Sequence, residues 1–176
     1  MFPYQINDKI TLKLPQPQND APALFHLIDS SRKEMLPWLP WVEKMTNEHE
    51  EADFLISVLK QTALQKALHT VIHYEHKPVG MLSFNTLDHE KHSAEIGYWL
   101  GTRYTSMGIM HTAVEALCRI GFEHYQLDTI EIHAASDNLA SNHVAEKAGF
   151  QLVEVRPNQE DLPDGHHDQN IWLLNK

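Results

Sequence analysis

The chain has 176 residues, 42% of them hydrophobic and 22% charged, and carries a formal net charge of −10. These values are typical of one globular domain spanning residues 1–176, and the acidic charge argues against nonspecific binding to nucleic acid or anionic membranes. The first residues lack the charged-then-apolar pattern of a signal peptide, and no apolar run reaches roughly 18 residues, so we expect a cytoplasmic protein. The single cysteine, Cys118, excludes an internal disulfide and is expected to be a buried, inert thiol.

The first third of the chain predicts a strand, a helix, a proline-containing loop and a second helix. Apolar and polar residues alternate over Lys9–Leu14, as in a half-buried strand. A helix is expected to begin near Asp20 and to end near Lys33. Two prolines in Met35–Val42 exclude a regular helix interior there. Asn47, with a glutamate three residues later, indicates a capping box for the next helix.

The rest of the chain predicts six strands and two helices, which together indicate one mixed α/β sheet with helices on both faces. The sheet is expected to be mostly antiparallel, with a central parallel pair joined through a helical crossover. In chain order, the predicted elements are strands at His69–Glu75, Val79–Asn85 and Ala94–Leu100, a helix from Gly108, a strand at Asp128–Ala135, a helix capped by Ser136–Asn138 and closed by Gly149, a strand at Gln151–Arg156, a polar loop at Asn158–Gln169 and a last strand at Asn170–Leu174.

A polar turn, Arg103–Gly108, joins the central strand Ala94–Leu100 to the long helix. Free backbone N–H groups at a helix start, together with the helix dipole, form a site for phosphate. The turn lacks the lysine of a P-loop and the three glycines of the dinucleotide fingerprint. It lies beyond the C-terminal end of a predicted parallel strand, where ligands of such sheets bind. An ordinary strand–turn–helix joint is the alternative.

A second group of polar residues lies at the start of the last helix. Asn138, Ser141 and Asn142 share one helical face with Ala145, beside an expected buried stripe of Ala140, Val144 and Ala148. Two amides and a hydroxyl at a helix N-terminus could hold a polar ligand arm, with Ser141 as proton donor. Alternatively, Asn138 is only a helix cap and Ser141 a solvated side chain.

Aromatic and histidine residues give weaker indications. Trp38 and Trp41 lie in the proline-containing loop, where they must either cap the core or line a cleft. The thirteen histidines show no metal-ligand spacing. The nearest candidate, the segment His166–Asp168, is better explained as a solvated loop, so we expect no metal site.

With these segments identified, the chain resembles the GCN5-related N-acetyltransferases (GNAT). Arg103–Gly108 resembles their acyl-coenzyme A loop, usually Gln/Arg-x-x-Gly-x-Gly/Ala. Ser106 replaces the first glycine, which keeps the N–H donor but argues against a positive φ there. Asn138–Phe150 resembles the closing helix motif of the family. The segments Ala94–Leu100 and Gly108–Val114 follow the family's order and spacing.

Three further segments resemble the RimJ/RimL branch, the ribosomal-protein N-terminal acetyltransferases. They are Trp38–Trp41, Gly80–Phe84 and a late Asp168 before a final strand. The resemblance runs from about Ile10 to Leu174. It implies the GNAT fold and transfer of an acetyl group from acetyl-coenzyme A to a primary amine in a ternary complex.

The resemblance also implies positions for the acetyl donor. Asn138 and Asn142 would contact the pantetheine arm, and a backbone N–H near Tyr98, Trp99 or Leu100 would polarise the thioester carbonyl. The coenzyme would lie on Arg103, Tyr104, Thr105, Ser106, Met107, Gly108, Ile109 and Met110, with its pyrophosphate on the N–H groups of the last five.

For the chemistry, the tyrosine that many family members use as general acid is replaced by Ala145. Ser141 is then the hydroxyl that would protonate the departing thiolate. Glu95 could accept the amine proton through a water, or it simply faces solvent or a neighbouring strand. Trp38, Trp41 and Asp168 are the acceptor-side candidates, with Asp168 attracting the cationic amine.

A protein N-terminus is the favoured acceptor, because an α-amine has a pKa near 8 and roughly a tenth of it is neutral at pH 7. A polyamine or an aminoglycoside is the first alternative. An acyl-coenzyme A sensor without turnover and a histidine-based metal hydrolase are further readings. The branch resemblance also allows a homodimer.

Overall fold

The computed structural model describes residues 1–176 and contains one eight-stranded sheet with the strand order β1-β2-β3-β4-β5-β6-β8-β7. Every neighbouring pair is antiparallel except β5 and β6, which are parallel. The strands are β1 (Tyr4–Gln5), β2 (Ile10–Lys13), β3 (Leu68–Tyr74), β4 (Lys77–Asp88), β5 (Ser93–Leu100), β6 (Thr129–Ala135), β7 (Gln151–Leu162) and β8 (Gly165–Asn175). The predicted mixed, mostly antiparallel sheet with one central parallel pair is confirmed.

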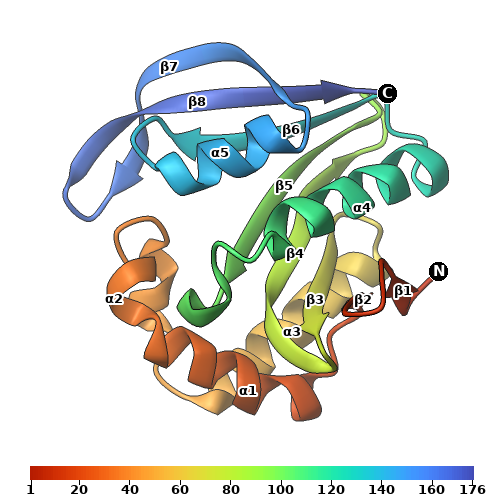
Figure 1. The fold of residues 1–176 in the computed structure, drawn as a ribbon, viewed down its shortest axis with the longest axis vertical. Helices are drawn as coiled ribbons and strands as arrows, with labels where there is room; N and C mark the ends of the chain where they lie inside the picture. The colour runs from red at the N-terminus through yellow and green to blue at the C-terminus, as the bar shows by residue number, and fades with distance from the viewer.

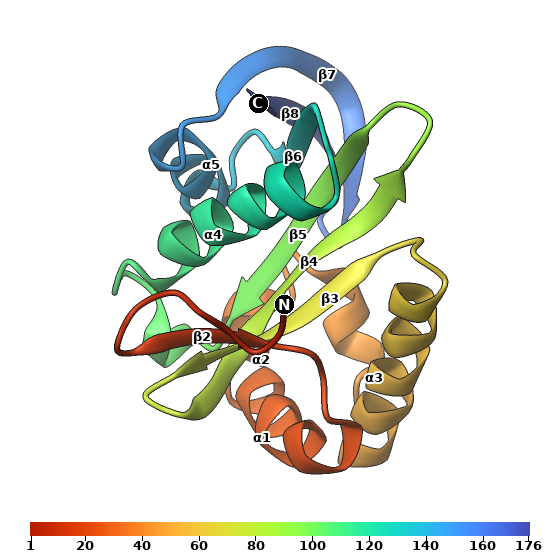
Figure 2. The ribbon, with the colours of Figure 1, turned by 90° about the vertical axis from the view of Figure 1, so that its right-hand side faces the viewer.

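Helices cover both faces of this sheet, as predicted (Figures 1 and 2). Figure 2 shows α4 and α5 on one side of the strands and α3 on the other. None of the helices is both long and apolar enough to cross a membrane. The helices are α1 (Pro17–Ser30), α2 (Arg32–Met35), α3 (Glu48–Ala63), α4 (Ile109–His124) and α5 (Leu139–Lys147), with short 3-10 turns η1 (Pro40–Lys44) and η2 (Thr102–Tyr104).

Each face of the sheet has its own hydrophobic core. On one face α4 packs Val114, Leu117 and Ile120 against β-strand side chains, so the apolar repeat read from the sequence is the buried stripe of this helix. On the other face Leu24 of α1 and Leu55 of α3 pack over the sheet. Removing this apolar area from water is the main term that stabilises the fold.

The parallel pair at the centre of the sheet is short. Pairing between β5 and β6 runs from Ser93 opposite Thr129 to Ile96 opposite Ile132, and no further. Figure 1 shows the two strands together near the C-terminus of the chain and spreading apart toward α2. Because a strand directs alternate backbone groups to each neighbour, part of the backbone of residues 97–100 faces the gap without a strand partner.

Cys118 and Asn47 behave largely as the sequence predicts. Cys118 is buried, and burial together with the charge of Glu115 raises the pKa of its thiol to about 12, so it is an inert core residue. Asn47 caps α3 by accepting hydrogen bonds from the N–H groups of His49 and Glu50. The Glu50 carboxylate reaches back to the Thr46 N–H, one residue earlier than a capping box predicts.

Three predicted boundaries near the N-terminal half and centre were wrong. Helix α1 begins at Pro17, because the Asp20 carboxylate lies in the first turn and accepts a hydrogen bond from Gln16 N at 2.7 Å. The turn before β4 contains only Glu75 and His76, which both adopt positive φ, so β4 starts at Lys77. Strand β4 also continues to Asp88 beyond a register shift.

The predicted polar loop at Asn158–Gln169 was also wrong, because these residues form the distal half of a long hairpin made by β7 and β8. Their side chains are mostly exposed, so the alternation that marks a half-buried strand is missing. Cross-strand contacts replace it: Gln169 Nε2 donates to Glu160 at 2.6 Å. A register shift between Arg156 and Glu160 accommodates Asn158 at φ +54°.

Candidate active site

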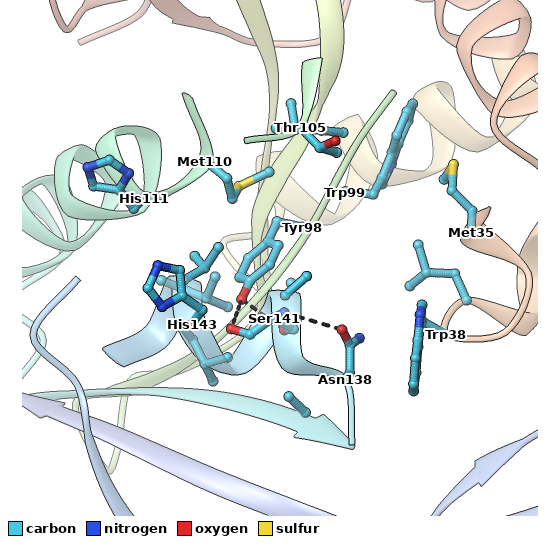
Figure 3. A pocket seen from close by; sticks show the side chains of 18 of the residues that line it. Met35, Trp38, Tyr98, Trp99, Thr105, Met110, His111, Asn138, Ser141 and His143 are labelled. Carbon is cyan, nitrogen blue, oxygen red and sulfur yellow. Dashed lines mark hydrogen bonds between the residues drawn. The ribbon is translucent and has the colours of Figure 1, made fainter. Parts of the chain in front are cut away.

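A cavity of about 650 Å³ lies where β5 and β6 separate. Its walls come from α2 and the loop after it, β5, the start of α4, β6, α5 and the β7–β8 hairpin. Figure 3 shows Met35 and Trp38 on one side of this cavity and Met110, His111 and His143 on the other, with Tyr98 between them. The cavity therefore has two sides that different elements supply.

One side is the turn that leads into α4. Gly108 is the N-cap residue of α4, at φ +77°, and no side chain caps the helix. The first N–H groups of α4 consequently lack side-chain partners, as a phosphate site requires. Ser106 adopts φ +61°, which corrects the expectation from its serine identity. A non-glycine residue in this region is strained, and the surrounding turn must hold it there.

The turn is anchored to the rest of the molecule by backbone contacts. Gly101 N donates to Val79 O on β4 at 2.9 Å. Thr102 N donates at 2.9 Å to Oγ of Ser31, a buried residue between α1 and α2. A Cβ on Gly101 would lie 2.6 Å from the Leu27 side chain, so a larger residue there would force Leu27 to move. These contacts fix where the start of α4 lies relative to β5.

The second group of polar residues forms a connected hydrogen-bond network. The Tyr98 hydroxyl on β5 lies 2.9 Å from Ser141 Oγ and donates to Ser141 O at 3.1 Å. Ser141 N donates to Asn138 Oδ1 at 3.2 Å, which is the N-cap bond of α5. Burial raises the pKa of the Tyr98 phenol to about 12, partly offset by its hydrogen bond with Ser141. Tyr98 is thus a neutral donor at physiological pH.

Asn142 and Asp168 make structural contacts and do not line the cavity. Asn142 Nδ2 donates to the carbonyls of Ala135 and Asn138, both at 2.8 Å. Its Oδ1 accepts hydrogen bonds from Asn170 and Trp172, both at 2.8 Å. Asp168 is exposed, and its carboxylate accepts a hydrogen bond from Asn158 N at 3.0 Å in the hairpin. Contacts of these two side chains with substrates stay predictions.

The buried face of α5 differs from the expected one. Ala145 is fully buried in the core on the α4 face, with Val144 and Ala148 packed beside it. Ala140, which was expected in the buried stripe, is exposed and lines the cavity. The cap at Asn138 sets the rotation of this short helix, so the stripe is turned by about one residue.

The two tryptophans of the loop after α2 differ in their environment. Trp38 lines the cavity together with Met35 and Leu39, which gives this side an apolar wall. Trp41 lies outside the lining, and its ring packs against Trp99 with 6.2 Å between ring centroids. Of the two alternatives that the sequence offered, the cleft wall therefore describes Trp38 and the core cap describes Trp41.

Several cavity residues belong to no sequence motif and were not predicted. Glu34 and Glu160 join Glu95 among the lining residues, so three carboxylates line the cavity. Asn85 reaches the cavity because Gly97 has no side chain: a Cβ there would lie 2.4 Å from Asn85 Nδ2. The strand alternation of β4 and β5 was the only signal for Asn85. Glu160 was hidden in the segment taken for a loop.

The cavity brings together most of the residues predicted from the sequence. Those that line it are Trp38, Glu95, Tyr98, Trp99, Leu100, Tyr104, Thr105, Ser106, Gly108, Ile109, Met110, Asn138 and Ser141. Those outside the lining are Trp41, Arg103, Met107, Asn142 and Asp168. The guanidinium of Arg103 lies over the Tyr104 ring, 4.9 Å from its centroid. No three His, Cys, Asp or Glu side chains are arranged to hold a metal ion.

The parallel pair of the mixed sheet opens beside an uncapped helix start, an arrangement suited to a protein that binds a phosphate-bearing ligand. The acetyltransferase (GNAT) domain family matches residues 9–151 of the chain. The chain belongs to this family and is an acetyltransferase, as its sequence motifs indicated.

Named relatives agree with this assignment. YdaF of Bacillus subtilis (strain 168), provisionally named a ribosomal N-acetyltransferase, is 31% identical over 178 residues, covering 100% of this chain and 96% of that protein. The ribosomal-protein-serine acetyltransferase of Escherichia coli (strain K12) is 28% identical and covers 88% of this chain and 87% of its own length. The microcin C7 self-immunity acetyltransferase MccE, solved with acetyl-CoA and AMP, superposes with a TM-score of 0.94 at 29% identity over 100% of this chain and 98% of its own.

Proposed function

We propose that this acetyltransferase moves the acetyl group of acetyl-coenzyme A to the α-amine of a protein N-terminus, with a ribosomal protein as the acceptor. The observation that carries the proposal is the cavity between β5 and β6, which combines an uncapped helix start with a hydroxyl network and an acidic, apolar acceptor side. The names of the Bacillus and Escherichia relatives support the ribosomal acceptor.

The donor fits the side formed by the start of α4. The pyrophosphate would accept hydrogen bonds from the N–H groups of Ser106 to Met110, where the positive φ angles of Ser106 and Gly108 orient the turn. The pantetheine arm would lie in the gap that begins after Ile96 and Ile132. Among Tyr98 to Leu100, a backbone N–H on the edge that faces the gap and has no partner on β6 would then donate to the thioester carbonyl, where negative charge develops during attack.

The acceptor fits the other side. Glu34, Glu95 and Glu160 give this side negative charge that attracts an ammonium group, and Trp38 with Leu39 packs against the first residue of the peptide. Trp41 and Asp168 would assist acceptor binding indirectly. Trp41 would support the apolar wall through its contact with Trp99, and Asp168 would hold the β7–β8 hairpin through its hydrogen bond with Asn158. Asn142 would act on the pantetheine arm by holding the start of α5.

The reaction then needs a neutral amine and a stabilised leaving group. The amine nitrogen attacks the thioester carbon, and the carbon–sulfur bond breaks as the tetrahedral intermediate collapses. Ser141 donates its hydroxyl proton to the sulfur, which is a good leaving group because an unperturbed thiol has a pKa of about 8.5. Glu95 or Glu160 could receive the amine proton through a water molecule.

The test is coenzyme A release from acetyl-coenzyme A in the presence of different amines. The panel contains peptides with N-terminal Ser, Ala or Met, an internal-lysine peptide with a blocked N-terminus, spermidine and an aminoglycoside. We expect turnover with the N-terminal peptides and at most background with the others. Turnover only with small amines would overturn the protein acceptor.

A small-molecule amine is the second candidate acceptor. The likeness to MccE, a self-immunity acetyltransferase solved with AMP, favours it. Adding an aminoacyl-nucleotide analogue with a free amine to the panel separates the two candidates, because a protein N-terminal acetyltransferase should prefer the peptides.

A further inference from the structure

His133 occupies a position on β6 that none of the motifs marked. It directly follows Ile132, the last residue of β6 that pairs with β5, so it lies at the mouth of the gap. Its side chain lines the cavity and is 20% exposed. On β5 the corresponding first unpaired residue is Gly97, which has no side chain to cover the ring. A group at this place faces whatever reacts where the strands separate.

The imidazole of His133 lies between two carboxylates. Its Nε2 is 2.6 Å from Oε2 of Glu131, and its Nδ1 is 3.7 Å from Oε2 of Glu95. The first distance is that of a strong hydrogen bond, and the second is too long for one. Glu131 therefore holds the ring, whereas the Nδ1 edge facing Glu95 is free of a protein partner.

This geometry selects one tautomer of the neutral ring. A carboxylate oxygen can only accept, so the hydrogen of the 2.6 Å contact must be on Nε2. The lone pair is then on Nδ1, on the side of Glu95 and the cavity. A base within reach of a substrate and oriented by a third group is the arrangement that activates nucleophiles in many enzymes.

We propose that His133 is the general base of the acetyl transfer, with Glu131 as its positioning residue; this rests on the proposed function. The acceptor binds as an ammonium group beside Glu95 and loses a first proton to solvent, which frees the lone pair of the nitrogen. The neutral amine nitrogen then attacks the acetyl carbon, and Nδ1 of His133 takes the second proton as the new carbon–nitrogen bond forms. The carbon–sulfur bond breaks, and the sulfur takes the proton of Ser141. Solvent restores the Ser141 proton and removes that of His133, so amine and thioester give amide and free thiol.

Two carboxylates flank the ring, and an ion pair on β7 carries two further charges near them. Glu95 comes from β5, Glu131 from β6, and Glu154 with Arg156 from β7, where Arg156 donates to Glu154 at 2.8 Å. The hydrogen bond from Arg156 is the main cause that lowers the pKa of Glu154, and electrostatic interaction with His133 is the smallest.

The kinetic test compares His133→Gln and Glu131→Gln with His124→Gln, a change at an exposed histidine near the end of α4. Glutamine retains a donor to Glu131 and removes the base. We expect kcat of His133→Gln to fall by about 100-fold or more, the range typical of a lost general base, with an unchanged KM for acetyl-coenzyme A. The kcat of Glu131→Gln should fall less than that of His133→Gln, and the kcat of His124→Gln should equal that of the wild type. Added imidazole should restore part of the activity of His133→Ala.

Activity of His133→Gln within twofold of wild type would overturn the inference while leaving the proposed function intact. A wild-type protein that acetylates no amine would overturn both. Ring nitrogen-15 NMR on the full chain gives a readout that does not depend on turnover: we expect the Nε2–H tautomer for neutral His133, lost in Glu131→Gln. A wild-type Nδ1–H tautomer would also overturn the inference.

Discussion

The phenol of Tyr98 and the hydroxyl of Ser141 are 2.9 Å apart, although 43 residues separate them in the chain. The phenol has a single hydrogen and two acceptors within reach, Oγ and the carbonyl oxygen of Ser141. When it donates to Oγ, the hydrogen of Ser141 is free to point into the cavity. When the phenol donates to the carbonyl oxygen instead, the Ser141 hydroxyl can donate to the phenol oxygen, so Tyr98 on β5 and Ser141 on α5 share the direction of this hydrogen bond.

Tyr98→Phe should lower kcat by about 3- to 10-fold, because a hydrogen bond between neutral groups contributes about 0.5–1.5 kcal/mol. The KM for acetyl-coenzyme A should change little. Steady-state kinetics of Tyr98→Phe, Ser141→Ala and the double variant measure the coupling. We expect Tyr98→Phe to have almost no further effect once Ser141 is alanine. Fully additive losses would show that Tyr98 does not act through Ser141.

Gly108→Ala should weaken coenzyme A binding and lower stability by about 1–2 kcal/mol, because alanine is strained at φ +77°. The new Cβ would also lie 3.2 Å from the His111 ring. Gly149→Ala is a matched control, since Gly149 adopts φ +87° with open space around it and lies outside the cavity. Calorimetry should show both variants destabilised and only Gly108→Ala impaired in binding. Equal affinities of the two variants for coenzyme A would show that the start of α4 does not bind the acetyl donor.

Trp38→Ala should raise the KM for the acceptor peptide by about 3- to 10-fold through loss of apolar contact. The KM for acetyl-coenzyme A should stay the same, because Trp38 lies on the opposite side of the cavity from α4. Trp41→Ala is the comparison: it removes the contact with Trp99 and should lower the melting temperature more than it changes either KM. A raised acceptor KM in Trp41→Ala, with mainly a lower melting temperature in Trp38→Ala, would show that Trp41 contacts the acceptor and Trp38 supports the core.

Glu51→Gln should stabilise the protein at pH 8 and leave stability at pH 4.5 nearly unchanged. Burial on α3 raises the pKa of the Glu51 carboxyl from 4.5 to about 7, and its Oε1 has no hydrogen-bond partner. Between those values the folded state keeps a proton that the unfolded chain loses, so stability falls as pH rises through this window. The full difference is on the order of 2–3 kcal/mol. Urea unfolding at both pH values measures it.

His69 has the opposite linkage and must be separated from Glu51. Burial lowers the pKa of the His69 ring to about 4. The unfolded chain therefore binds a proton below about pH 6.5 that the folded state refuses, and this term makes stability rise with pH. The wild-type curve is consequently flatter than either group alone would give. Only the difference between Glu51→Gln and wild type isolates Glu51, and a constant difference from pH 4.5 to 8 would contradict its raised pKa.

The elements that the sequence predicts well are those with strong local signals. The apolar period of α4, the Asn47 cap and the hydrophobic strands β5 and β6 depend on neighbouring residues alone. The same is true of the Arg103–Gly108 turn, whose place at the end of β5 follows from chain order. The fold and the donor side of the cavity could therefore be anticipated.

The features that the sequence does not predict depend on residues far apart in the chain. Asn142 holds α5 to β8 through Asn170 and Trp172, about thirty residues later, so its face of the helix could not be judged locally. Likewise, the two carboxylates within 4 Å of His133, Glu95 and Glu131, come from different strands. The exposed hairpin lacks any apolar alternation, and its register depends on cross-strand polar pairs.

Because the pairing between β5 and β6 is so short, the sheet consists of two parts that are only weakly joined. Four residue pairs are all that join strands β1–β5 to strands β6–β8 across the sheet. A donor lying in the gap would contact both parts and act as a cross-brace between them. Loading the protein with coenzyme A should then raise its melting temperature by mass action, and amide hydrogens at the seam should exchange more slowly than those at the outer edges of the sheet.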